Sequence, residues 1–334
     1  MEIEGKQSRR PEPTRKPMKY SKKPKAPLKE RITKIVQKNK YLWLLLAPGM
    51  IILLLFKYAP MTGLYMAFVN YAPSKLGYFH DLLSAPFVGW DWFSYFFEND
   101  FFLIMRNTLG ISLLTLLISF PIPILIAVFL NDVSNSLVKK GIQTAAYFPY
   151  FVSWVIAANM MLEMFSGNGI INQILQFLHI TDGNILFFQE DKYFWWLMAI
   201  SNTWKTMGYN AIVFLAAISG INTEQYEAAK IDGAARWQQL IYITLPAIKS
   251  TIIVMLILAV GNVLNTGFEQ ILLLQNQATI NYSEVIDTYT YRYGMQKGMY
   301  SYGTAVGLFR SVVAFILVVG ANKISRKMNQ SSLY

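Results

Sequence analysis

The chain has 334 residues, of which 54% are hydrophobic and only 15% are charged. Soluble domains carry about 25% charged residues, so this composition, with a mean hydropathy of +0.32, indicates a membrane protein. The sequence contains no cysteine and two histidines, which excludes disulfide scaffolds, thiol catalysis, Cys-based metal sites and histidine-rich metal sites.

Residues 1–40 form the first predicted domain, a basic tail. They hold 14 Lys or Arg and 4 Asp or Glu, so nearly all of the formal net charge of +11 lies there. Like charges and five prolines predict an extended segment, with a short amphipathic helix over residues 28–40. Such a tail binds either nucleic acid or the cytoplasmic membrane surface. The apolar residues that follow favour lipid, and we expect no nucleic-acid partner.

Six apolar segments follow the tail and define the second predicted domain, residues 41–326. A hydrocarbon core of about 30 Å requires about 20 residues of helix. Because the segments lack strict alternation, helices fit them better than barrel strands. The expected fold class is therefore an all-α integral membrane protein with six transmembrane helices. The predicted spans are residues 41–59, 107–131, 141–162, 193–220, 250–268 and 303–322.

The basic residues predict the orientation of these spans. With the tail in the cytoplasm and six crossings, the inner pieces hold 22 Lys or Arg and the outer pieces 6, as the positive-inside rule requires. Both termini, including the C-terminal tail 327–334, are then cytoplasmic. The run Tyr193–Trp196 is typical of an aromatic belt at the outer end of the fourth span.

The longest inner loop, residues 221–249, predicts a helix–glycine–helix elbow. Asn222 or Thr223 is expected to cap a first helix that ends near Ile231. Gly233 permits a left-handed residue or a close backbone approach. A second short helix is expected over residues 234–243, and Pro246 suits the first turn of the next membrane helix.

Small side chains around the bend would let this elbow enter a groove on a partner protein. Glu227 and Arg236 would fix the two arms to each other or to that partner. The alternative interpretation is an ordinary amphipathic loop. The spacing, however, resembles the EAA signature of ABC importer permeases: Glu-Ala-Ala, three residues, Gly, nine residues, Ile-x-Leu-Pro. That resemblance implies a coupling helix that docks on an ATP-binding subunit. The residues implied in coupling are Glu227, Ala228, Ala229, Asp232, Gly233, Ala234, Arg236, Ile243, Leu245 and Pro246.

The resemblance extends over about residues 40–330, which look like maltose-type, MetI-like sugar permeases. Residues 265–274, 286–294 and 304–325 resemble the branch that handles complex oligosaccharides and polysaccharide fragments. This implies a type I ABC importer permease core in a bacterial cell membrane. The partners implied are a second homologous permease, two ATP-binding subunits, an outer solute-binding lipoprotein, membrane lipid and a carbohydrate substrate.

No G-x-x-x-x-G-K-[ST] phosphate loop occurs in the chain. We therefore expect a non-catalytic transport subunit without a cofactor of its own, with ATP and Mg bound by the partner ATPase subunits. The rivals are a permease for a non-sugar solute and, from another class, a membrane enzyme acting on envelope polysaccharide. The enzyme would need an acid–base cluster that the inner loops do not offer. The GTAVG run, residues 303–307, fits close helix packing, with a glycine hinge as the alternative.

A sugar path is expected among the charged, aromatic and amide side chains of the spans. Charged groups in a membrane usually mark a cavity or pathway. Lys205 and Arg310 either form structural ion pairs or line an aqueous cavity, where they would favour an acidic sugar. Glu163 and Glu269 lie nearer the outer ends. Sugars stack on aromatic rings and bind amides. The candidates are Tyr147, Tyr150, Trp154, Trp204, Lys205, Tyr209, Asn262, Asn265, Glu269 and Arg310.

Overall fold

The computed structural model describes residues 39–327, and every regular element in that range is helical. The prediction of an all-α chain is thus confirmed for the described residues. The chain divides after Thr62 into two units. Most of the predicted tail, residues 1–40, and of the C-terminal tail, 327–334, lies outside the described residues.

In its described part, from residue 39 on, the first unit contains one helical run. Helix α2 (Lys40–Leu53) continues through a π-helical turn, η1 (Leu54–Tyr58), into the 3₁₀ helix η2 (Ala59–Phe68), which ends in the second unit. Residues 40–68 are long and apolar enough to cross a membrane. The run of α2, η1 and η2 therefore extends beyond the predicted span 41–59.

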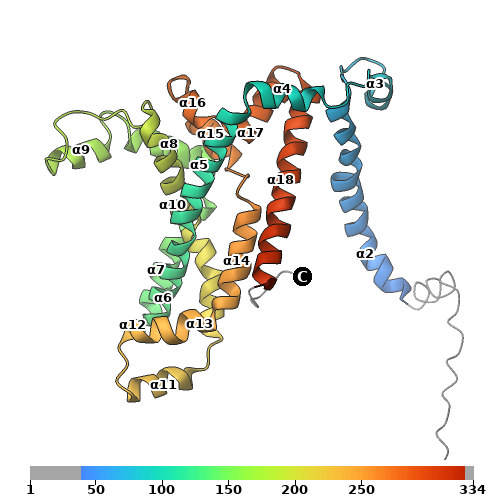
Figure 1. Cartoon of the computed structure of the whole chain (residues 1–334). Coiled ribbons are helices and arrows are strands. Elements are labelled where there is room, and N and C mark those ends of the chain that lie inside the picture. The colour runs from blue at the N-terminus through green and yellow to red at the C-terminus, as the bar shows by residue number, and fades with distance from the viewer. Residues whose placement is uncertain (1–38, 328–334) are drawn as a thin grey trace, which may run out of the picture. The chain divides into compact units, whose positions relative to one another are not determined.

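The second unit is a bundle arranged around α10 (Asp191–Ser219), which packs against three helices (Figure 1). These are α5 (Phe101–Ser119), α6 (Pro121–Asp132) and α7 (Ser136–Phe151). A Cβ at Gly208 would lie 2.0 Å from the carbonyl oxygen of Ala146, so α10 and α7 approach at backbone distance. Helix α14 (Lys249–Gly261) packs on α18 (Tyr300–Lys327).

Among the described residues, three helical stretches are long and apolar enough to span a membrane: 40–68, 101–132 and 300–327. Two bent pairs bring the number to five. Helix α10 has 29 residues but is not among them, because it carries polar side chains that are buried against its neighbours, Ser201, Thr203 and Lys205 included.

Three predicted spans do not have the expected form. The span 141–162 is not one straight helix: α7 and α8 (Trp154–Met164) meet at an angle of 100°. Helix α7 ends at Phe151. The Ser153 hydroxyl accepts a hydrogen bond from the backbone N–H of Ile156 and so caps the start of α8. The span 250–268 overshoots α14, which ends at Gly261. The span 107–131 begins later than α5, which starts at Phe101.

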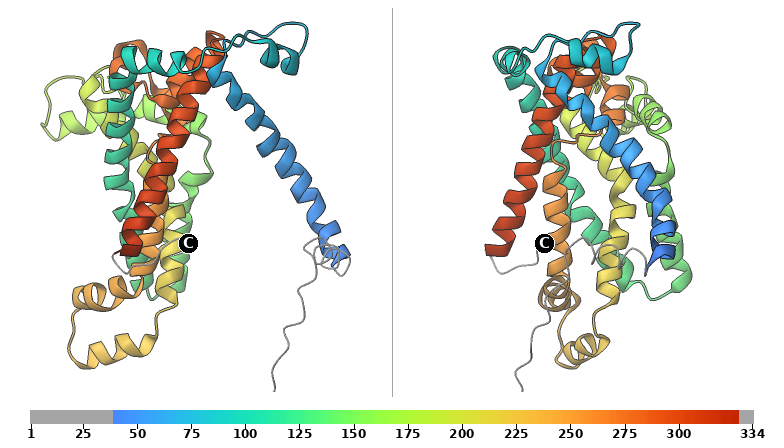
Figure 2. Two further views of the ribbon diagram at one scale, coloured as in Figure 1. Left: turned by 45° about the vertical axis from the view of Figure 1, so that its right-hand side comes forward. Right: turned by 90° about the vertical axis from the view of Figure 1, so that its right-hand side faces the viewer.

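Short helices gather at the two ends of the bundle (Figures 1 and 2). One end holds α3 (Tyr78–Ser84), α4 (Asp91–Asn99), α8, α9 (Ile170–Phe177), α15 (Phe268–Leu274), η4 (Gln277–Thr279), α16 (Ile280–Ser283), α17 (Ile286–Thr290) and η5 (Tyr291–Gln296). The other end holds α11 (Thr223–Ile231), α12 (Arg236–Gln239), η3 (Leu240–Thr244) and α13 (Leu245–Ala247).

The end with α4 and α17 has a buried aromatic core. Phe96, Tyr289 and Tyr302 are almost fully buried, and the Tyr289 hydroxyl donates to Asp100 Oδ2 over 2.5 Å.

The predicted aromatic belt at 193–196 is only partly correct. Phe194 is fully buried and Trp195 donates to the carbonyl of Tyr282, so these two rings pack inside the bundle.

The glycines of the GTAVG run have different surroundings. A Cβ at Gly303 would lie 2.7 Å from the Cα of Gly294, whereas Gly307 has no neighbour within 4 Å among the described residues. Helix α18 continues unbroken through the run. Close packing is therefore confirmed at Gly303, and the glycine hinge stays an untested alternative.

Candidate functional site

The inner elbow is built by the local signals that the sequence contains. The Asn222 side chain accepts a hydrogen bond of 3.0 Å from the Glu224 N–H and caps α11, so the prediction of Asn222 as the cap is confirmed. At the other end, the N–H of Ala234 bonds to the Ala229 carbonyl and that of Gly233 to the Lys230 carbonyl. Gly233 has φ +77°, which completes a Schellman motif with the predicted left-handed glycine.

The two arms of the elbow are joined by neutral groups. The Tyr226 hydroxyl and Thr244 Oγ1 share a hydrogen bond of 2.8 Å, and Gln239 Nε2 donates to the Ala234 carbonyl over 2.9 Å. Within residues 39–327 neither Glu227 nor Arg236 forms an ion pair, so they do not fix the arms to each other. The alternative, that they contact a partner protein, stays a prediction.

The second arm is longer than predicted. Helix α12, the π-helical turn η3 and α13 form one run over residues 236–247, which bends by 66° into α14. Pro246 lies in α13, before the bend. The expectation that it opens the membrane helix is therefore wrong, and Lys249 begins that helix.

The coupling candidates lie on a surface that projects from the end of the bundle (Figure 2). Glu227, Ala228, Asp232, Gly233, Arg236 and Pro246 are exposed, and Ala229, Ala234, Ile243 and Leu245 are partly buried. A hollow of about 970 Å³ separates this elbow from residues 125–134 at the end of α6. The arrangement is a bent segment whose exposed charges, Glu227, Lys230, Asp232 and Arg236, form no ion pair within residues 39–327.

A second feature is a cavity of about 470 Å³ between α5, α6, α10 and α14. None of its lining residues is charged. The polar lining residues are Ser112, Thr115, Ser119, Asn202, Asn210, Asn262, Asn265 and Thr266, and the rest are apolar or aromatic.

Two features of the backbone place these polar groups. Ser112, Thr115 and Ser119 lie one helical turn apart on one face of α5. Residues 262–267, between α14 and α15, are not helical, and this break brings Asn262, Asn265 and Thr266 to the cavity. Irregular backbone at membrane depth occurs where it lines a cavity or is buried in protein.

Two hydroxyls in the cavity wall lack a hydrogen-bond partner among the described residues. They are Ser112 Oγ and Thr266 Oγ1, and both side chains are buried. A buried hydroxyl without a partner is destabilising, and both oxygen atoms are enclosed by protein. The uncharged lining of amides and hydroxyls suits a neutral, hydroxyl-rich part of a ligand.

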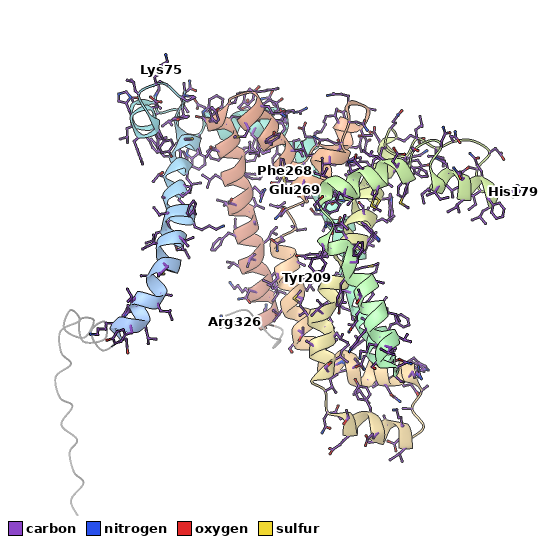
Figure 3. The ribbon with its side chains drawn as sticks, turned by 180° about the vertical axis from the view of Figure 1, so that it is seen from behind. Lys75, His179, Tyr209, Phe268, Glu269 and Arg326 are labelled. Carbon is purple, nitrogen blue, oxygen red and sulfur yellow. The ribbon has the colours of Figure 1, made fainter. Side chains whose placement is uncertain are left out.

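Of the predicted sugar-path residues, Asn262 and Asn265 line the cavity and the others do not. Tyr150 and Tyr209 instead stack on each other, with ring centroids 4.0 Å apart. Tyr209 lies midway along the bundle (Figure 3). Tyr147 is half-buried beside Gly208, and Trp204 is partly exposed on α10.

Lys205 caps the end of α7 from within the bundle. Its Nζ donates to the carbonyl oxygens of Pro149, Tyr150 and Val152 and lies 5.4 Å from the centre of the Trp154 ring. A cation is favoured at the C-terminus of a helix. The role is structural, but the predicted ion pair is wrong, because the partners are carbonyls and not a carboxylate.

Arg310 has a partner of its own, since it forms an ion pair with Asp287 of α17. The structural interpretation of Arg310 is therefore the one that the geometry supports. Glu269 is exposed at the start of α15 beside Phe268 (Figure 3), and Glu163 is exposed near the end of α8.

A second ion pair joins Glu284, which follows α16, to Arg292 of η5. Burial raises the pKa of Glu284 to about 7, against the opposing effect of Arg292 and Lys297. The nearby carboxylate of Asp100 acts in the same direction as burial.

The sequence interpretation missed six polar residues of the cavity: Ser112, Thr115, Ser119, Asn202, Asn210 and Thr266. A signal existed for three of them, because Ser112, Thr115 and Ser119 recur at helical spacing in an otherwise apolar stretch. Small hydroxyls in membrane helices also serve helix packing, so this signal does not by itself indicate a binding site.

Comparisons with known proteins agree with these features. The family described as "Binding-protein-dependent transport system inner membrane component" matches residues 101–330. Protein LplB of Bacillus subtilis (strain 168) is 44% identical over 301 residues, covering 90% of this chain and 92% of that protein. The polygalacturonan/rhamnogalacturonan transport system permease protein YteP of the same organism is 41% identical over 308 residues, covering 92% and 94%.

Two crystal structures of a bacterial importer of the acidic polysaccharide alginate have chains with the same fold. Each match has a TM-score of 0.81 and 38% sequence identity. It covers 100% of the solved chain and 90% or 91% of this chain. In one of them the transporter is in complex with an alginate pentasaccharide-bound periplasmic protein.

Proposed function

The chain belongs to the family of binding-protein-dependent transport system inner membrane components, and from this premise we propose that it is one permease subunit of a carbohydrate-importing ABC transporter. The observation that carries the proposal is the elbow of residues 222–247. It is a rigid, exposed bend with the EAA spacing, and its charged residues Glu227 and Arg236 have no ion-pair partner among the described residues.

The proposed mechanism is alternating access. An outer solute-binding protein delivers the sugar, and two ATPase subunits close on ATP. Their movement displaces the elbow of this chain and that of a second, homologous permease. The spans then rock as rigid bodies around a site near the midplane. The ATPase subunits bind ATP and Mg. This chain receives their movement at the elbow and forms part of the sugar path.

We propose six crossings, with α10 as the span that hydropathy alone does not detect. At 1.5 Å per residue, its 29 residues extend over about 43 Å, enough for a core of about 30 Å. The elbow and residues 131–134 line the same hollow, and Lys139 and Lys140 follow directly in α7. This shared end supports a cytoplasmic location by the positive-inside rule, with both termini inside.

The uncharged cavity supports hydrogen bonding to sugar hydroxyls as the mode of substrate contact. Amides and hydroxyls offer both donors and acceptors. Lys205 and Arg310 already have intramolecular partners, so selection for acidic sugars does not depend on them. Relatives named for polygalacturonan and alginate transport support an oligosaccharide or polysaccharide fragment as the substrate.

Purification of the tagged chain from its native membrane tests the function. We expect two ATPase subunits and a second permease to co-purify, and ATP hydrolysis in proteoliposomes to rise when a binding protein loaded with an oligosaccharide is added. Oligogalacturonate, oligoalginate and a neutral oligosaccharide of equal length form the panel. Stimulation only by a non-sugar solute would indicate the rival permease. Turnover of glycan by the chain alone would indicate an enzyme.

A further inference from the structure

Helix α9 (Ile170–Phe177) presents its apolar side outward. Ile170, Ile174, Phe177 and Leu178 follow a helical spacing that places them on one face, and all four are exposed, Phe177 at 81%. A helix on the surface of a water-soluble domain has the opposite arrangement, with its apolar stripe toward the core.

On its polar side, α9 is fixed to the protein by hydrogen bonds, with Asn172 buried and Gln173 and Gln176 exposed. Asn172, opposite the apolar face, is fully buried. Its Nδ2 donates to the carbonyls of Ser166 and Ile185, and its Oδ1 accepts from the Ile185 N–H. Gln176 Nε2 donates to Asn184 Oδ1 over 2.7 Å. The outward position of the apolar face is therefore built into the loop of residues 165–190.

The apolar face of α9 comes after other exposed apolar side chains. It follows the exposed apolar side chains of α8, which belongs to a bent candidate span, and Val155, Ile156 and Met160 are among these. Helix α9 projects sideways from the end of the bundle where α10 begins (Figures 1 and 3). The first turns of α10 carry Tyr193 and an exposed Trp196, residues that favour the membrane–water boundary.

The chemistry of the face fits lipid rather than a charged surface. Between Glu163 and Asp182 the sequence contains no Asp, Glu, Lys or Arg. A short helix at the boundary of a bilayer buries its apolar face among acyl chains and keeps its polar side toward water or protein. Here the protein binds Asn172, while Gln173 and Gln176 are exposed.

We propose that the apolar face of α9 inserts into the outer boundary of the bilayer and anchors the loop of residues 165–190 to lipid. The proposal rests on the proposed orientation of the permease, in which this end of the bundle faces outward. The anchor would hold the broken joint between α7 and α8 at a constant depth while the spans move.

The absence of cysteine from the sequence makes a site-directed label straightforward. Single cysteines at Ile174 and Phe177 would each carry an environment-sensitive fluorophore, with Asp182→Cys at the exposed tip of the same loop as the matched control. The full chain would be reconstituted in liposomes that contain a lipid with a nitroxide near the head of its acyl chain. Iodide in the outer medium serves as the aqueous quencher.

We expect the nitroxide lipid to quench the labels at 174 and 177 several times more than the label at 182, and iodide to show the reverse order. Strong iodide quenching at 174 and 177 would overturn the proposal, as would shielding of both labels from both quenchers, which would indicate a protein partner. The two positions control for a local folding defect in either variant. The readout needs no ATPase subunit, so it separates failure of the anchor from failure of the transport function.

Discussion

At the scale of single residues, two glycines with the same left-handed backbone conformation lie at opposite ends of the bundle. Gly233 has φ +77° and Gly298 has φ +71°, and neither would bring a Cβ within 4 Å of another group in the described chain. A substitution at either position therefore meets the same local strain, about 1–2 kcal/mol for a left-handed side chain. Any difference between the two variants comes from what each surface contacts.

We predict that Gly233→Trp inserts normally but hydrolyses ATP without moving sugar, because the bulky ring disturbs the docking of the elbow. Gly298→Trp, with the same backbone strain, is expected to keep coupled transport. The ratio of sugar imported to ATP hydrolysed in proteoliposomes measures the effect. Coupled uptake by Gly233→Trp would contradict the proposed role of the elbow.

The cavity gives a second prediction at this scale. Asn210 and Asn265 line it, and each amide bond to a ligand is worth about 1 kcal/mol. Asn210→Ala and Asn265→Ala should each raise the sugar concentration for half-maximal uptake by about fivefold. Asn99→Ala, at the end of α4 away from the cavity, is the control. If all three variants transport alike, the cavity does not hold the substrate.

At the scale of elements, the joint between α7 and α8 depends on a side chain from a third helix. Lys205 is 8% exposed and donates to three carbonyls at the end of α7. We predict that Lys205→Met lowers the free energy of unfolding by about 1–3 kcal/mol, because the buried carbonyls lose a charged donor. The melting temperature in detergent, followed by tryptophan fluorescence, measures this. Unchanged melting combined with lost uptake would favour a direct contact with sugar instead.

The buried carboxyl of Glu284, at the end of α16, gives a prediction about pH. Burial raises the pKa of Glu284 to about 7, so the folded state holds a proton that the unfolded state has released. Stability from this carboxyl is complete below its ordinary pKa of 4.5 and is lost as the pH rises toward about 7. Glu284→Gln should therefore show a flatter fall in melting temperature over this range. Equal slopes for the two proteins would show that Glu284 titrates normally.

The same elements show what the sequence allowed us to predict and why the rest was hidden. The cap at Asn222 and the left-handed Gly233 depend on neighbouring residues, so a local pattern was sufficient for both. The bend between α7 and α8 depends on Ser153 together with Lys205, which is 52 positions away in the chain. The ion pair between Arg310 and Asp287 likewise joins two helices. Such contacts depend on packing, which periodicity does not report.

At the scale of the whole second unit, the proposed coupling surface and the proposed substrate cavity lie in different parts of the described bundle. The elbow of residues 222–247 projects from one end, and the uncharged cavity lies between the spans. Helix α10 connects them, since it lines the cavity through Asn202 and Asn210 and is separated from α11 by three residues. We propose that a displacement of the elbow reaches the cavity wall through this helix.

Cysteine crosslinking at the elbow tests the central claim most directly. Ala228→Cys places a single thiol on the exposed face of α11 in a chain without native cysteine. In native membranes, a short bifunctional crosslinker should join this position to an ATPase subunit, and a membrane-impermeant maleimide added outside intact cells should not label it. Labelling from outside, or the absence of any ATPase adduct, would contradict the account.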